Sequence, residues 1–245
     1  MINSQVYTAI LLSLIFLVSC DKDEDMPCQT PEPQSKTTML EFSFNADDEL
    51  FSYNEVYDFN GVKVSFSELR LYLSDMVLSD SNGNSELMEE TAILLDVGSA
   101  ENIFTIGNTD YEYIEDLQML FGLNNEVNHL DPTTQEAPLN NAGMHWGWNP
   151  DSGYKFLKAE FSVDTDDDGT PDSNGSIHCA TDGLARDIML DVNMNVTGSS
   201  AKVMLNADVI AFFNGVDFLN LMGTHGDSDL TNLVADNVAA AINIQ

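Results

Sequence analysis

The chain has 245 residues and a formal net charge of −33, from 41 acidic against 8 basic side chains. This charge excludes a nucleic-acid binder, because binding to phosphates requires a positively charged surface. Hydrophobic residues make up 43% of the sequence, too large a share for an intrinsically disordered chain. The sequence therefore predicts a folded protein with a highly solvated acidic surface, which also attracts cations.

The first residues predict export from the cytoplasm. Residues 9–19 form an apolar run of signal-peptide length, too short to cross a bilayer as a helix. The run ends in Leu17-Val18-Ser19-Cys20, which resembles the lipobox of bacterial lipoproteins. We therefore predict a signal peptide over residues 1–19 and lipid on Cys20. No Lys or Arg precedes the apolar run, so an uncleaved N-terminal anchor is the alternative.

The segment after Cys20 is acidic and then rich in proline. Residues 21–25 resemble the acidic, lysine-containing tag that sends some lipoproteins to the outer face of the outer membrane. Residues 26–38 contain three prolines and suit an extended tether. We expect an outer-membrane lipoprotein, periplasmic or exposed at the cell surface. Its lipidated tether spans residues 20–36 and its single folded domain spans residues 37–245.

Alternating apolar and polar residues predict a series of strands in this domain. The segments are 39–44, 62–66, 69–78, 111–123, 154–163, 176–180, 188–196 and 201–213. The last two look like a pair of strands joined across Gly198. Residues 92–97 are a short apolar run, which suits a strand buried on both faces. Residues 124–142 are polar and irregular, as in a functional loop or lid.

The pattern changes near the end of the chain. After Gly226 apolar residues recur at helical spacing, and Asp227 or Ser228 is a suitable N-cap. The fold class predicted is mostly β: a single antiparallel β-sandwich-like domain with long loops and a short C-terminal helix.

An acidic loop at residues 164–172 has the spacing of a calcium site. Carboxylates stand at positions one, three, five and nine, glycine at six, and a backbone carbonyl ligand is expected at seven. The calcium candidates are Asp164, Asp166, Asp168, Thr170 and Asp172. Gly175 stands where an EF-hand has glutamate, so the loop looks more like the short Asp-rich loops of thrombospondin type 3 repeats and dockerins. A solvated acidic hairpin loop is the alternative.

An aromatic stretch, residues 143–156, holds both tryptophans of the chain, Trp146 and Trp148, together with His145. Turn-forming residues divide it, and a strand pattern follows. One interpretation is that the two indoles fill one end of the hydrophobic core, since large aromatic side chains are usually buried. The other is that His145 and the tryptophans belong to a metal or redox site.

The four histidines are His129, His145, His178 and His225. Histidine outside the cytoplasm is a candidate ligand for copper or zinc. None of the four stands in a His-x-His or His-x-x-x-His pair, so the fold must assemble any site. For each one alone, an ordinary hydrogen-bonded role is the alternative.

Cysteines and catalytic motifs say little about chemistry. Besides Cys20 the chain has Cys28 and Cys179, which are compatible with a disulfide or with two free thiols. The sequence contains no Gly-x-Ser-x-Gly, His-Glu-x-x-His or phosphate-binding glycine loop. We therefore predict that the protein is not an enzyme.

The order of several motifs carries a family resemblance over nearly all of residues 40–244. The motifs are Leu40-Glu41-Phe42-Ser43-Phe44, Tyr57-Asp58-Phe59-Asn60-Gly61, residues 64–75, Phe121-Gly122-Leu123, Gly143-Met144-x-Trp146-x-Trp148, Gly153-Tyr154-x-Phe156, His178, His225 and Asn237. In this order they resemble the MbnP-like domain family, of the methanobactin-associated periplasmic protein type. These are secreted or lipid-anchored bacterial proteins related to copper-binding proteins of methane oxidisers.

The resemblance implies a β-rich domain that binds copper through two histidines and a kynurenine. The kynurenine is an oxidised tryptophan made by a partner di-haem peroxidase resembling MauG. By resemblance His178 and His225 are the first candidates for copper ligands and His145 is the third. Trp146 and Trp148 are the candidates for oxidation. Some copper-binding relatives place the modified tryptophan two residues before a histidine, whereas here His145 directly precedes Trp146.

The function predicted is a secreted, lipid-anchored copper-binding protein for copper acquisition or handling. The alternative is a calcium-stiffened surface module that binds carbohydrate or another partner without copper. Such a module would use exposed aromatic side chains and the loop at residues 124–142.

Overall fold

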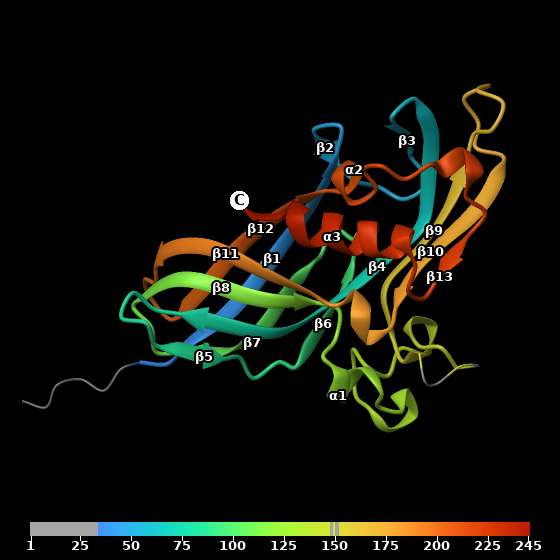
Figure 1. The fold of residues 1–245 in the computed structure, drawn as a ribbon. Coiled ribbons are helices and arrows are strands. Elements are labelled where there is room, and N and C mark those ends of the chain that lie inside the picture. The colour runs from blue at the N-terminus through green and yellow to red at the C-terminus, as the bar shows by residue number, and fades with distance from the viewer. Residues whose placement is uncertain (1–33, 148, 150–151) are drawn as a thin grey trace, which may run out of the picture. The chain divides into compact units, whose positions relative to one another are not determined.

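The computed structural model describes residues 34–147, 149 and 152–245 (Figure 1). Residues Gln34–Gln245 form one compact unit. The predicted lipidation site Cys20, Cys28 and Trp148 lie outside the described residues. Within the described ranges, no helix combines the length and the apolar character that crossing a membrane requires.

The first sheet is centred on strand β1 (Lys36–Ala46). Its order is β14 (Ile242–Ile244), β12 (Ser200–Asp208), β1 and β2 (Glu49–Leu50), and β7 (Ile103–Thr109) also pairs with β1. Strict alternation of buried and half-buried residues along β1 follows from its apolar and polar alternation. The pairing of β1 with β12 is parallel.

The second sheet is centred on β4 (Val62–Ser79), an 18-residue strand. The order is β11 (Arg186–Asn195), β8 (Tyr113–Phe121), β4, β9 (Lys155–Val163), β10 (Ser173–Ala180) and β13 (Thr224–His225). Three short strands also pair with β4: β3 (Val56–Phe59), β5 (Ser85–Leu87) and β6 (Ala92–Asp96). Shifts in the register of β4 against β9 and β8 mark bulges, which let one long strand serve several partners.

The mostly β, sandwich-like fold class is confirmed, with a C-terminal helix. Three details differ from the prediction. The sheets are mixed and not purely antiparallel, because β1 pairs with β12 and β10 pairs with β13 in parallel. The segments 62–66 and 69–78 are one strand, β4, and the segments 188–196 and 201–213 do not pair with each other. The first of these last two, β11, pairs with β8, and the second, β12, pairs with β1 in the other sheet.

Strand β12 ends at Asp208 because a short helix begins there. The Asp208 side chain accepts a hydrogen bond from the Ile210 N–H and caps α2 (Val209–Phe212). The C-terminal helix α3 (Asp229–Ala241) is capped by Ser228, one of the two predicted caps, in a capping box with Thr231. Helix α3 contacts β10 and β11 (Figure 1). Most of its buried residues are apolar.

The core is formed by apolar side chains of both sheets and by phenylalanines at one end. The Phe66 and Phe213 rings stack with centroids 5.0 Å apart, and Phe218 meets Phe59 and Phe161 edge to face. Such aromatic pairs contribute stability beyond the area they bury.

The predicted irregular loop after β8 contains only short helical turns. These are α1 (Asn125–Asn128), η1 (Pro132–Thr134) and η2 (Ala142–Met144), each capped by a preceding Asn or Asp side chain. The loop leads directly into the aromatic stretch and positions it beside β9.

Candidate metal centre

A row of directly opposite residues crosses five strands of the second sheet. In the register, Asp96 of β6 faces Arg70 of β4, which faces Lys158 of β9. Lys158 faces His178 of β10, and His178 faces His225 of β13. Residues directly opposite one another point to the same side of a sheet. The row therefore places charged side chains and two of the four histidines on one face.

His178 and His225 lie in contact at the end of this row. Their Nδ1 atoms are 3.0 Å apart and their ring centroids 4.7 Å apart. Parallel pairing of β10 with β13 and a hydrogen bond from the Gly226 N–H to the His178 carbonyl hold the two strands together. His178 is buried, whereas His225 is exposed, so solvent reaches the pair from the β13 side.

Burial lowers the pKa of His178, and the hydrogen bond to the Glu160 carboxylate opposes that shift without cancelling it. The neutral imidazole is the form that offers a lone pair to a metal ion.

Trp146 packs against both histidines. Its ring centroid is 5.5 Å from that of His178 and 5.6 Å from that of His225, in edge-to-face arrangements. The side chain is only 7% exposed. The three aromatic rings thus form one cluster.

His145, the third predicted ligand, takes a different place. Its ring packs edge to face on Tyr154 with centroids 4.9 Å apart. Burial, followed by the nearby charge of Lys155, lowers the pKa of His145. The structure thus gives His145 a packing contact beside the cluster.

The loop that carries Trp146 is held by a buried amide. Asn128 accepts a hydrogen bond from the Tyr154 N–H at 2.7 Å and donates one to Asp182 at 2.7 Å. Gly153 stands beside it at φ +66°, where an added Cβ would meet the Asn128 side chain at 2.3 Å. Glycine is therefore required at that position by both backbone conformation and space.

Lys155 binds the same loop from the strand side. Its ammonium donates to the carbonyls of Gly143 at 3.0 Å and His145 at 3.3 Å, and lies 4.6 Å from the Trp146 ring centroid. Burial lowers the pKa of Lys155. The contact with the indole face is a cation–π interaction that fixes the ring against the histidines.

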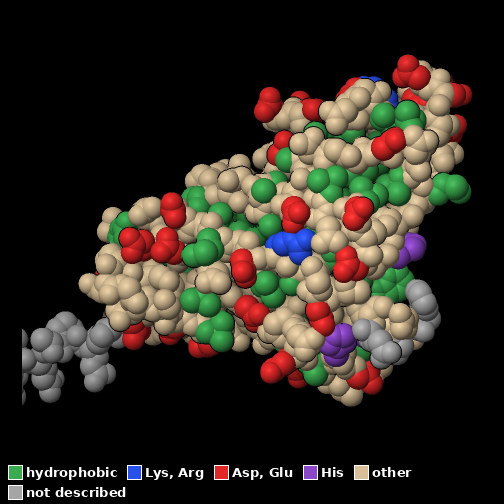
Figure 2. Space-filling model, in the orientation of Figure 1, with side chains coloured by type: hydrophobic (Ala, Val, Ile, Leu, Met, Phe, Trp, Pro, Cys, Tyr) green, Lys and Arg blue, Asp and Glu red, His purple; other side chains and the backbone are tan. Residues whose placement is uncertain are grey.

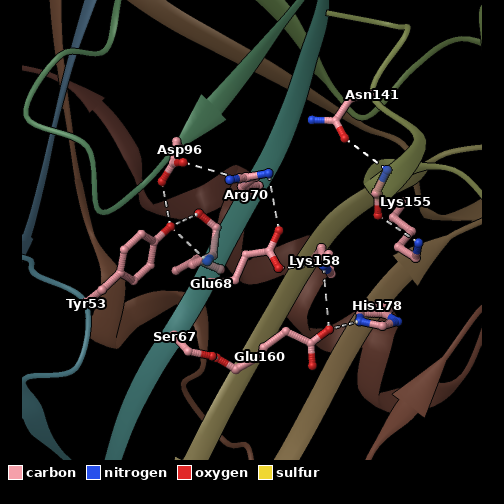
Figure 3. Close-up of polar contacts among 12 residues, drawn as sticks. Tyr53, Ser67, Glu68, Arg70, Asp96, Asn141, Lys155, Lys158, Glu160 and His178 are labelled. Carbon is pink, nitrogen blue, oxygen red and sulfur yellow. Dashed lines mark hydrogen bonds and ion pairs between the residues drawn. The ribbon is translucent and has the colours of Figure 1, made fainter.

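A network of charged side chains on β9 and β4 lies next to His178 (Figure 3). Glu160 on β9 reaches the His178 Nε2 at 2.8 Å. Lys158 lies between Glu160 and Glu68, at 3.9 Å from the first and hydrogen-bonded to the second. Glu68 in turn pairs with Arg70.

The two imidazoles are a donor set that copper or zinc can use. Two imidazole nitrogens face each other, and imidazole is a ligand for copper and zinc. Among the described residues, no third His, Cys, Asp or Glu completes a ligand group with this pair. A structural zinc site takes four protein ligands, and the described residues bring two imidazoles together here.

The predicted calcium loop brings three of its carboxylates together. Ligand atoms of Asp164, Asp166 and Asp168 all lie within 4.8 Å of one another. Repulsion from Asp168, with burial second, raises the pKa of Asp166. Asp172 instead accepts hydrogen bonds from the Thr165 backbone and hydroxyl, and the Thr170 N–H donates to Asp168.

Sequence reasoning did not single out Glu160, Lys155 or Lys158. Alternation along residues 154–161 places Lys158 and Glu160 on one face of a strand. This shared face was the only indication in the sequence that the two side chains act together. Their proximity to His178 depends on the register of β9 against β10, which no local pattern specifies.

Comparisons with known proteins agree with the fold. The family model described as MbnP matches residues 35–228. The solved structure of MbnP from Methylosinus trichosporium matches with a TM-score of 0.56 and 14% identity, covering 80% of this chain and 82% of that one. No curated protein matches the sequence. Since the family match spans most of the chain, this protein belongs to the MbnP family.

Proposed function

We propose that this protein binds copper between His178 and His225 and serves in copper acquisition or handling, without catalysing a reaction itself. The observation that carries the proposal is the 3.0 Å approach of the two Nδ1 atoms beside a buried tryptophan. The exposed side of His225 gives a metal ion access from solvent. The Trp146 ring packed on the buried His178 limits competition from water.

Trp146 is the tryptophan that we propose to be oxidised to kynurenine by a partner di-haem peroxidase resembling MauG. Its ring touches both histidine rings, so a ketone oxygen formed on this side chain would arise next to the metal. The other candidate, Trp148, lies outside the described residues.

The proposed place of action is the outer membrane, with lipid on Cys20 and the folded body in the periplasm or at the cell surface. The acidic surface supports a cation-binding role in general. Figure 2 shows Asp and Glu side chains scattered across the visible face and only small areas of Lys and Arg. Such a surface raises the local concentration of cations.

We propose calcium binding as a separate, structural property of the loop at residues 164–172. The three-carboxylate cluster supports it. The alternative of a copper-free module that recognises its partner through exposed aromatic side chains is not favoured, because Trp146 is buried.

A pair of matched variants tests the copper proposal. Purified protein would be loaded with copper, dialysed and analysed for bound metal. His178→Ala with His225→Ala should abolish copper retention, whereas His129→Ala with His145→Ala should retain it. Equal retention by both double variants would refute the assignment of the ligands.

A further inference from the structure

The hydrogen bond between Glu160 and His178 fixes where the imidazole proton lies. The Glu160 Oε1 is 2.8 Å from the His178 Nε2. An ionised carboxylate carries no hydrogen and only accepts hydrogen bonds. The proton of a neutral His178 therefore lies on Nε2, and its Nδ1 carries a lone pair.

The same logic assigns the proton between the two histidines. At 3.0 Å the His178 Nδ1 and His225 Nδ1 atoms form a hydrogen bond, which needs one hydrogen between them. Since His178 Nδ1 is the acceptor, His225 Nδ1 is the donor. If His178 and His225 held a metal ion together, the proton between them would have to leave. The Nδ1 proton of His225 would go to water and its Nε2 would take one up, so the imidazole would stay neutral.

Glu160 is itself held in place by its neighbours. On the adjacent strand β4, Glu68 lies directly opposite Glu160 in the register. Lys158 separates these two like charges and contacts both carboxylates. The Glu160 side chain remains 34% exposed, so it is placed by charge pairing and strand register more than by burial.

We propose that Glu160 is a positioning residue that holds His178 in the Nε2–H tautomer, with its Nδ1 lone pair directed at the metal position. The inference rests on the proposed function in one respect: it takes His178 to be a ligand. Metal-binding histidines commonly donate their second N–H to a carboxylate, which orients the ring and raises its basicity.

The chain offers a matched control. Glu41 in the first sheet is paired with Lys202 at 2.7 Å and its side chain is 33% exposed, close to the value for Glu160. The Glu41 carboxylate forms an ion pair with a lysine, whereas the Glu160 carboxylate forms a hydrogen bond with a histidine. Glu41→Gln therefore reproduces the loss of a half-exposed charge without affecting His178.

The test combines tautomer and affinity measurements on the same variants. Nitrogen-15 NMR of the metal-free protein should show His178 as the Nε2–H tautomer in the wild type and in Glu41→Gln. Glu160→Leu should give a mixture of tautomers. Copper affinity in Glu160→Leu should fall by about 10–100-fold, the usual effect of removing such a partner. Glu160→Gln, whose amide oxygen still accepts, should lose less.

Retention of both the wild-type tautomer and the wild-type copper affinity in Glu160→Leu would overturn the proposal. Should that variant fail to fold, the same two measurements on Glu160→Ala decide, because alanine also removes the acceptor. Wild-type values in both would overturn the proposal. A wild-type chain that binds no copper would refute the proposed function instead, while the tautomer in the metal-free protein would still test Glu160.

Discussion

His178 on β10 lies directly opposite His225 on β13, although the two residues are 47 positions apart in the sequence. Strand β13 is only two residues long, and its parallel pairing with β10 is the contact that brings the rings together. Trp146 reaches the same place from a third part of the chain. The centre is thus assembled entirely by tertiary contacts.

Asn128 should be a main support of the loop that carries Trp146. It is fully buried and bonds both Tyr154 and Asp182. Asn128→Ala leaves the buried Tyr154 N–H without an acceptor, which should lower the free energy of unfolding by about 1–3 kcal/mol. Denaturant unfolding measures the change.

Asn125 is the matched control for this prediction. It also donates to Asp182 but is exposed. Asn125→Ala should change the free energy of unfolding by no more than about 0.5 kcal/mol. Equal destabilisation by the two substitutions would contradict the role assigned to Asn128.

Cys179 should be unreactive in the folded protein. Its side chain is fully buried, and burial raises the pKa of the thiol to about 12. The reactive thiolate is therefore scarce at pH 8 and inaccessible to reagents. Peptide mapping after treatment with a thiol reagent should find Cys179 unmodified in native protein and modified after unfolding. Rapid modification of native protein would contradict the burial.

Calcium should stabilise the protein through the loop at residues 164–172. A cation there relieves the repulsion that raises the pKa of Asp166. Addition of calcium should raise the melting temperature of the wild type but not that of the Asp166→Asn, Asp168→Asn double variant. The Asp187→Asn, Asp191→Asn variant, altered at exposed positions on β11, should respond like the wild type. A calcium response that survives in the first variant would exclude this loop.

We predict that oxidation to kynurenine falls on Trp146. Its ring contacts both proposed ligands. After co-expression with a di-haem peroxidase of the MauG type, mass spectrometry should find kynurenine in the wild type and in Trp148→Phe. Trp146→Phe should lack it. Modification confined to Trp148 would contradict the assignment.

Most of the strands could be predicted from the sequence because alternation records which face of a strand is buried. Apolar residues at helical spacing located the C-terminal helix, and Ser228 was one of its two predicted caps. Partners could not be predicted, because alternation does not say which strands pair. For this reason β11 and β12 were expected together, although they belong to different sheets.

For the centre itself, the sequence supplied the residues but not their arrangement. His178 and His225 were chosen through the family resemblance, and nothing in the short segment Thr224–His225 predicted a strand. Glu160 was missed because its contact with His178 is diagonal across two strands and appears only when the register is known.

The most direct test of the central claim is the metal content of the folded body, residues 34–245. The protein would be incubated with equal amounts of copper, zinc and calcium, desalted and analysed by elemental mass spectrometry. Our account predicts one copper ion per chain, with or without calcium, and no stoichiometric zinc. Calcium without copper, or zinc in place of copper, would contradict a copper centre at His178 and His225.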